Sequence, residues 1–272
     1  MEYLLMYFRK PINIDRIRSL ILHRILLPGS VPILALMIWL FLTQTQSVRG
    51  LFPTPVAVGS ALLNLLQDGS LLENLKISTV RALSGFLVGG FIGFGLGVLN
   101  GQFRLAEEIF NTPIQMIRNV PHLALLPLVL IWFGIGELSK LVLISLGTFF
   151  PIYLNTFHGI RYVNQELLEM GKVYGLSRWQ LFKEIILPGA MSSILIGVRQ
   201  SLGIMWLTLI VAEMIAAKSG IGYMATNARE FMLMDVVVLS LLIYAFLGSL
   251  SDLIASWAER VLLRWHANYR KE

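Results

Sequence analysis

Two ionisable side chains lie inside long apolar stretches of this 272-residue chain. Arg199 falls within residues 189–212, and Asp252 falls within residues 236–257. An arginine at the centre of a bilayer costs on the order of 3 kcal/mol, so such residues are candidates for a functional role. If each stretch is helical, with a rise of 1.5 Å per residue, the two residues lie at similar depth in the membrane. We expect either an ion pair between them or contact between the Arg199 guanidinium and a transported anion.

Other polar side chains could line a path through the membrane together with Arg199. His122 follows Pro121, and proline disfavours helix for Val120, so we expect irregular backbone there, which membranes tolerate beside a cavity. Each of these residues could instead bond across packed helices. The candidate path residues are Asn119, His122, Arg199, Gln200 and Trp206.

The sequence lacks the residues that a metal site, an ATP-binding loop or a catalytic site would need. The chain has no cysteine, and its four histidines are scattered, so we predict no metal site. It has no G-x-x-x-x-G-K-[ST] phosphate loop, because the pair Gly171-Lys172 lacks the earlier glycine and is followed by Val173. One buried arginine and one aspartate do not make a convergent catalytic group. We therefore predict a non-enzymatic chain that carries no cofactor.

The composition indicates an all-α membrane protein. Hydrophobic residues make up 56% and charged residues 14% of the chain, whereas soluble domains are about 25% charged. A span needs roughly 20 apolar helical residues, and stretches of this kind predict six transmembrane helices in a single membrane domain, residues 25–258. The expected spans are 25–43, 82–101, 119–136, 141–160, 189–212 and 236–257.

The distribution of positive charge predicts the orientation. With six spans, most of the 22 lysines and arginines lie on the side of both termini and of the segment 161–188. The positive-inside rule places that side in the cytoplasm, with basic tails at 1–24 and 259–272. The net charge of +6 therefore reflects topology, and we expect a lipid bilayer and not nucleic acid as the partner of these basic residues.

The second expected span carries glycine at every fourth position. A four-residue spacing aligns glycines along one ridge, where another helix can approach closely. We predict that the ridge packs helices, with a ligand groove as the alternative. The ridge comprises Gly85, Gly89, Gly93, Gly97 and Gly101.

The segment "EMGKVYGLSRWQLFKEIILP", residues 169–188, is charged between apolar neighbours. Gly175 predicts the end of one short helix, and Ser177 with Gln180 predicts a capping box that starts another. Pro188 is expected to stop the second helix. A helical wheel places Trp179, Leu181, Phe182, Ile185 and Ile186 on one apolar face. That face could rest in the lipid interface or fill a groove on a soluble partner.

This segment resembles the cytoplasmic EAA loop of ABC importer permeases, through the spacing E-x5-G-x9-I-x-L-P. Met170 and Gly171 replace the two alanines of that pattern. The resemblance implies that the segment docks an ATPase. The implied coupling residues are Glu169, Met170, Gly171, Gly175, Trp179, Phe182, Ile185, Leu187 and Pro188.

The rest of the chain resembles the permease subunits of aliphatic sulfonate ABC importers, within the nitrate, sulfonate and taurine permease group. The similar stretches include "RNVPHLALLPLVLIWFGIGE", "LGTFFPIYLNTFHGIR" and "LLRWHANY". The resemblance implies the type I permease fold in a bacterial inner membrane, a homodimer, two separate ATPase subunits that bind ATP and Mg²⁺, and an extracytoplasmic binding protein. A permease for taurine, nitrate or another small anion is the alternative, and an autonomous secondary transporter or channel is a further one.

The loop between the last two expected spans is a further candidate site. Its Gly-rich turn "SGIG" predicts a flexible connection. The resemblance implies an outer gate that meets the binding protein, and the alternative is an ordinary loop at the membrane interface. The implied gate residues are Ser219, Gly220, Gly222 and Tyr223.

Overall fold

The computed structural model describes residues 27–44 and 52–265. Its residue contacts divide the chain into two units, Met1–Ser60 and Ala61–Glu272. The described residues form helices and connecting turns, with no strand among them. The expected tail 1–24 and the last residues of the expected tail 259–272 lie outside the described ranges.

The first unit contains helix α3, Leu27–Gln44, which corresponds to the first expected span. Its apolar part, Ser30–Thr43, is shorter than a full span. The Trp39 indole donates a hydrogen bond to the carbonyl of Pro53 over 3.0 Å. Helix α5, Pro55–Gln67, contains the boundary between the two units.

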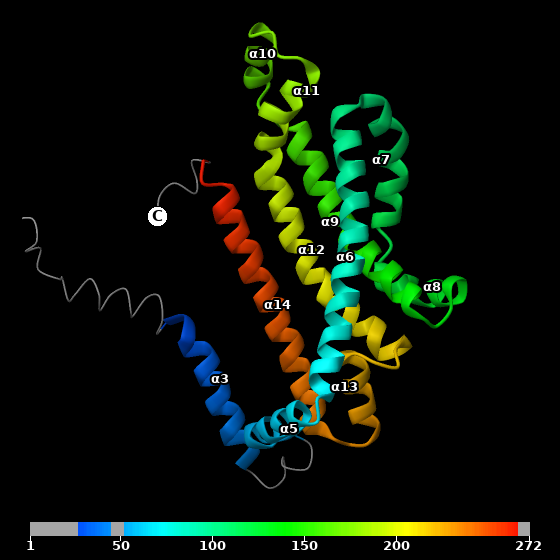
Figure 1. Ribbon diagram of the computed structural model, residues 1–272, viewed down its shortest axis with the longest axis vertical. Coiled ribbons are helices and arrows are strands. Elements are labelled where there is room, and N and C mark those ends of the chain that lie inside the picture. Colours follow the sequence, from blue (N-terminus) through cyan, green and yellow to red (C-terminus); the bar gives the residue numbers. More distant parts are fainter. Residues whose placement is uncertain (1–26, 45–51, 266–272) are drawn as a thin grey trace, which may run out of the picture. The chain divides into compact units, whose positions relative to one another are not determined.

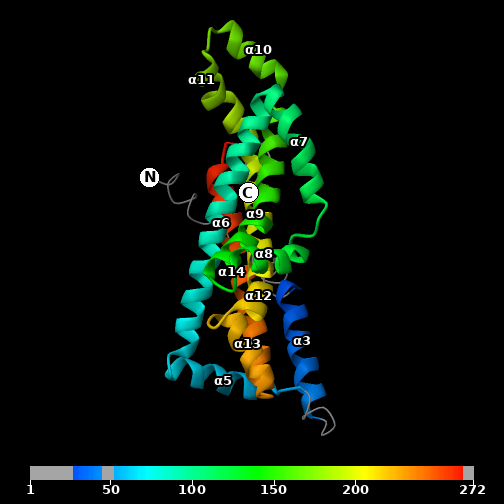
Figure 2. The same ribbon diagram turned by 90° about the vertical axis from the view of Figure 1, so that its right-hand side faces the viewer.

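The second unit is built on four long helices that run alongside one another (Figure 1). These are α6 (Ser70–Gln102), α9 (Glu137–Arg161), α12 (Leu187–Ala216) and α14 (Met234–Leu262). The short helices α10 (Gln165–Val173) and α11 (Arg178–Leu181) lie at one end of the unit, and α13 (Ile221–Glu230) lies at the other, as the turned view in Figure 2 also shows.

The described residues contain four helices long and apolar enough to cross a membrane, or up to five if a bent pair is one span. Each extends beyond the charge-free window expected from the sequence. Helix α6 begins at Ser70, whose hydroxyl and backbone N–H donate to Asp68 and hold the pKa of that carboxyl below its usual range. Helix α14 continues to Leu262, so the expected C-terminal tail begins within a helix. The count of six spans stays a prediction.

The third expected span, 119–136, is not a single straight helix. Helix α7 (Arg104–Arg118) is followed by the four-residue 3₁₀ turn η2 (His122–Leu125) and the eight-residue helix α8 (Leu126–Phe133). The chain bends by 83° between α7 and this pair. Pro121 explains the break, because its ring disfavours helical backbone in the preceding residue. The irregular backbone expected at His122 is confirmed.

The glycine ridge of α6 lies directly against α9. A Cβ on Gly93 would stand 2.6 Å from the carbonyl oxygen of Phe149, and one on Gly89 would collide with the carbonyl of Ser145. The close approach lets the Ser145 hydroxyl donate to the carbonyl of Gly85 over 3.0 Å. Without side chains, the two backbones come near enough for hydrogen bonds that strengthen helix packing in a membrane.

The expectation that Pro188 ends the second short helix is wrong. One helix continues from Arg178 to Ala216, and Phe182–Ile186 within it form a π-helical turn, η3. Proline lacks an N–H and its ring crowds the carbonyl four residues earlier, which for Pro188 is that of Glu184. A π turn widens the helix at this point and accommodates the ring without ending the helix.

Candidate functional site

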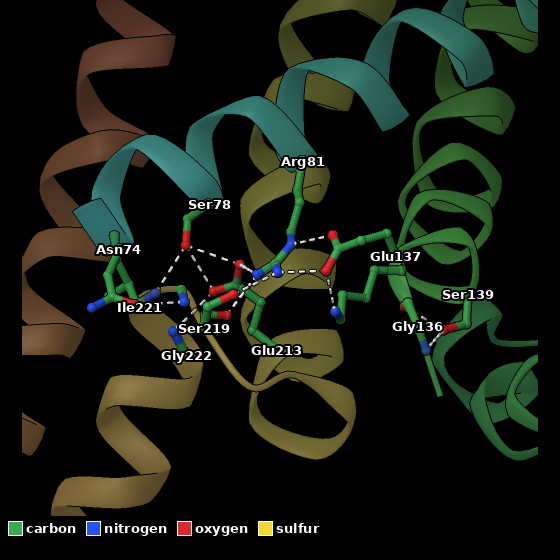
Figure 3. Close-up of polar contacts among 12 residues, drawn as sticks. Asn74, Ser78, Arg81, Gly136, Glu137, Ser139, Glu213, Ser219, Ile221 and Gly222 are labelled. Atoms are coloured by element: carbon green, nitrogen blue, oxygen red, sulfur yellow. Dashed lines mark hydrogen bonds and ion pairs between the residues drawn. The ribbon is translucent and has the colours of Figure 1, made fainter. Parts of the chain in front are cut away.

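A charge network joins α6, α9, α12 and α13 at the α13 end of the second unit (Figure 3), and it is buried at Arg81, Lys140 and Glu213 while the Glu137 side chain stays 60% exposed. Arg81 comes from α6, Glu137 from the first residue of α9, and Glu213 from the last turn of α12. The loop that leads into α13 supplies Ser219 and the N-terminal backbone of that helix. Arg81 and Lys140 balance the charges of Glu137 and Glu213, so the cluster is neutral overall.

The Arg81 guanidinium uses all five of its N–H donors. It donates to both carboxylate oxygens of Glu137 over 2.5 and 2.6 Å and to Glu213 over 2.8 Å. Its other two bonds, of 2.6 and 2.9 Å, go to the carbonyl and the hydroxyl of Ser219. Because a guanidinium has five donors in a rigid fork, full use fixes the position of each partner.

Glu213 is fully buried and accepts hydrogen bonds from four groups. Besides Arg81, these are the hydroxyls of Ser78 and Tyr244 and the backbone N–H of Gly222, at 2.8 to 3.0 Å. Gly222 lies in the first turn of α13, so the carboxylate stands at the positive end of that helix. A buried charge is tolerated only when paired and hydrogen-bonded in this way.

The network fastens the loop 217–222 to the long helices. The Gly220 N–H donates to Asn74 over 2.6 Å, and the Ile221 N–H donates to Ser78 over 2.9 Å. Gly220 has a φ of +107°, a backbone conformation that L side chains rarely adopt, and a Cβ there would collide with the Glu213 carboxylate. Ser219, Gly220 and Gly222 of the predicted gate thus lie in the network, whereas Tyr223 takes no part in its hydrogen bonds.

Sequence reasoning missed Arg81 and Glu213. The search for charge-free stretches began the second expected span just after Arg81 and ended the fifth just before Glu213. Both residues therefore fall outside the expected spans, although they lie within α6 and α12. The available signal was a pair of opposite charges directly beside two long apolar stretches.

Arg199 and Asp252 form an ion pair between α12 and α14. The guanidinium donates to the two carboxylate oxygens over 2.5 and 2.9 Å, and Glu259 lies 3.8 Å from it. The side chains of the pair remain 43% and 54% exposed, so this chain leaves both accessible from one side. Of the two roles expected for Arg199, the structure shows the ion pair.

The other predicted path residues do not converge on one site. The Trp206 indole donates to Ser251 of α14 over 2.8 Å, on the side of α12 that also carries Arg199. His122 lies 3.0 Å from the hydroxyl of Thr208. Gln200 accepts a 3.3 Å bond from Asn155 of α9, and Asn119 is exposed at the end of α7. Trp206 and Gln200 therefore bond from α12 to different helices, α14 and α9, and His122 contacts α12 itself.

Helices α10 and α11 form a hairpin at the opposite end of the unit (Figure 1). Its turn matches the local prediction: Gly175 has a φ of +76°, and the capping box of Ser177 and Gln180 is confirmed. Gly171 allows close packing within the hairpin, because a Cβ there would stand 2.6 Å from Leu181 and 2.7 Å from Ile185.

The apolar face predicted for residues 179–186 mostly packs within the chain. Leu181 is buried, and Phe182, Ile185 and Ile186 pack against a core cluster that includes Ile160 and Ile194. Trp179 is the one member of the predicted face that stays exposed, at 69%. Besides Trp179, the hairpin exposes apolar side chains outside the predicted face: Leu167, Met170, Val173 and Tyr174.

Comparisons with known proteins agree with this architecture. A family described as the inner membrane component of binding-protein-dependent transport systems matches residues 85–264. The chain is 52% identical over 219 residues to the putative aliphatic sulfonates transport permease protein SsuC of Escherichia coli, covering 80% of this chain and 83% of the relative. It is 35% identical to the taurine transport system permease protein TauC of the same organism, covering 88% of each.

A solved structure supports the fold. The crystal structure of an amino acid ABC transporter with histidines matches 73% of this chain and 97% of its own, with a TM-score of 0.60 and 16% identity. Together with the family match and the long apolar helices, this places the molecule among multi-pass inner membrane proteins. The chain belongs to the inner membrane components of binding-protein-dependent transport systems.

Proposed function

We propose that this chain is the membrane permease subunit of an ATP-driven importer of aliphatic sulfonates. The observation that carries the proposal is its 52% identity to an aliphatic sulfonates permease over 80% of the chain, against 35% to a taurine permease. The subunit supplies the path through the membrane and leaves ATP and Mg²⁺ to a separate ATPase. Taurine, nitrate and other small anions are the alternative substrates.

The ATPase docks on the hairpin of α10 and α11. The supporting observation is its exposed apolar surface, in which Val173 and Tyr174 are 86% and 79% exposed beside the polar side chains of Lys172 and Arg178. Apolar anchors surrounded by polar groups are typical of helix-in-groove docking. We assign docking to this exposed surface and not to the apolar face inferred from sequence, because most of that face packs inside the chain.

Two copies of the permease enclose the path, and a binding protein delivers the substrate at the α13 end. Both termini then lie in the cytoplasm, as the positive-inside rule predicts. ATP shifts the equilibrium between outward-open and inward-open states through its preference for the closed ATPase dimer. The loop 217–222, held by Arg81 and Glu213, acts as the outer gate.

Reconstitution tests the proposal. Proteoliposomes that contain the permease, its ATPase and its binding protein should take up a labelled alkanesulfonate only with ATP inside, and excess taurine or nitrate should compete poorly. Preferred uptake of taurine or nitrate would reassign the substrate. Uptake by the permease alone, driven by an ion gradient without ATP, would show an autonomous transporter and refute the proposal.

A cross-linking experiment tests the docking surface. A photoreactive residue at Tyr174 or Trp179 should capture the ATPase subunit in the assembled complex. The same residue at Phe182, which packs within the chain, is the matched control and should not. Capture of phospholipid alone from Tyr174 and Trp179 would contradict docking at this hairpin.

A further inference from the structure

A cleft of about 1010 Å³ opens where the ends of α6 and α9 meet the hairpin of α10 and α11. The hairpin lies at the end of the unit opposite α13 (Figures 1 and 2). The residues that line the cleft fall into three groups: polar, aromatic and aliphatic. They include Gln102, Phe103, Ile160, Arg161, Leu168, Arg178, Trp179 and Ile186.

The charge of the cleft is positive. Its charged lining residues are Arg161 and Arg178, and no carboxylate lines it. Glu107, outside the lining, pairs with Arg161 over 3.2 Å, and the Arg161 side chain remains 42% exposed. Arg178 makes no ion pair among the residues that the structure describes. An anion that enters the cleft therefore meets one guanidinium without a carboxylate partner and a second that is partly exposed.

The floor of the cleft is apolar, and its rim carries aromatic rings as well as the two arginines. Leu168, Leu181 and Ile186 form part of the floor, and the exposed rings of Phe103 and Trp179 stand at its edge. Aromatic rings and arginines together are typical of the level where lipid headgroups meet acyl chains. A free phosphate would satisfy the arginines but leave the apolar floor uncovered, whereas a lipid covers both.

The depth of the cleft fits a lipid headgroup. Helix α6 has 33 residues and α9 has 25, which correspond to lengths of about 50 and 38 Å, against a hydrocarbon core of about 30 Å. The apolar windows of these helices end at Gly101 and Ile160, so Gln102 and Arg161, which line the cleft, lie where the hydrocarbon core ends. The charged rim lies at headgroup level and the apolar floor lies next to the acyl chains.

We propose that this cleft binds one anionic glycerophospholipid, with its phosphate against Arg161 and Arg178 and its acyl chains on the apolar floor. Basic pockets between transmembrane helices bind such headgroups elsewhere. The site adjoins the proposed ATPase surface and shares Arg178 and Trp179 with it, whereas the most exposed residues of that surface, Val173 and Tyr174, do not line the cleft. A lipid held here joins the hairpin to the ends of α6 and α9.

Native mass spectrometry of the purified full chain, titrated with phosphatidylglycerol in detergent, tests the site. We expect one tightly retained lipid per chain, and phosphatidylcholine should bind more weakly. At about 1 kcal/mol per basic residue, Arg161→Gln and Arg178→Gln should each weaken retention about fivefold, and the double variant about thirtyfold. Unchanged elution and helix content establish that the variants fold.

Arg104→Gln is the matched control. Arg104 lies near the same end of α6 and pairs with Glu108 within α7, with 84% of its side chain exposed, and it does not line the cleft. This variant should retain the lipid. An equal loss with Arg104→Gln would mean non-specific attraction to surface charge and would overturn the proposal. Displacement of the lipid by millimolar inorganic phosphate, or by the ATPase subunit, would overturn it as well.

Discussion

Replacing Glu213 by glutamine should destabilise the α13 end of the molecule strongly. The carboxylate is fully buried and accepts hydrogen bonds from Arg81, Ser78, Tyr244 and the N–H of Gly222. A glutamine keeps one oxygen acceptor and turns an NH₂ group toward donors. The substitution also removes one of the two negative charges that balance Arg81 and Lys140.

The size of the effect follows from burial. Breaking a buried ion pair costs about 3–5 kcal/mol, and Arg81 keeps its bonds to Glu137, so we expect about 3 kcal/mol, the lower end of that range. For a chain of this size, about 3 kcal/mol corresponds to a Tm about 6–12 °C lower. Thermal unfolding of the purified protein, followed by tryptophan fluorescence, measures the shift.

Glu108→Gln is the control for loss of charge alone. Glu108 pairs with Arg104, and their side chains are 61% and 84% exposed, so the loss should stay below about 1 kcal/mol. A second measurement is trypsin cleavage after the exposed Lys218, which should accelerate in Glu213→Gln because the loop 217–222 loses its anchor. If both variants lowered the Tm equally and cleavage did not change, the role of the buried network would be refuted.

Gly89→Ala should lower stability by about 1–3 kcal/mol in a thermal unfolding assay, since its Cβ would collide with the backbone of α9; Gly95→Ala, on the same helix with open space at its Cβ, should be neutral or stabilise by up to about 1 kcal/mol. Arg199→Asp and Asp252→Arg should each abolish sulfonate uptake, and the double variant should restore it; a folded but inactive double variant would mean that Arg199 contacts the anion. Tyr174→Ala, at a 79% exposed ring, should reduce the amount of ATPase that co-purifies with the permease by about tenfold without changing the Tm, and full retention of the ATPase would contradict docking there.

Local sequence rules predicted the features that depend on a few neighbouring residues. The capping box of Ser177 and Gln180 and the turn at Gly175 follow from backbone geometry alone, and the structure contains both. The same rules failed at Pro188, because they treat proline as a helix breaker and do not include the π turn that accommodates it.

Local sequence rules could not predict features that depend on contacts between distant parts of the chain. Periodicity identified the apolar face of residues 179–186 but not its partner, which is the core around Ile160. A search for charge-free spans also excludes a compensated charge such as Arg81 or Glu213, because the carboxylates that pair with Arg81 lie 56 and 132 positions away along the chain. A hydropathy scale penalises each charged residue separately. It therefore does not detect a network in which the charges neutralise one another.

The uninterrupted helix from Arg178 to Ala216 joins the two ends of the permease. Its 39 residues carry Trp179 near one end and Glu213 near the other, about 50 Å apart at 1.5 Å per residue. A rod of that length, tilted by about 6°, moves its far end by about 5 Å, nearly one helical turn. On the proposed assignments of the ATPase surface and the outer gate, a torque applied by the ATPase at the hairpin would strain the hydrogen bonds of Glu213 directly, with no intervening loop between them.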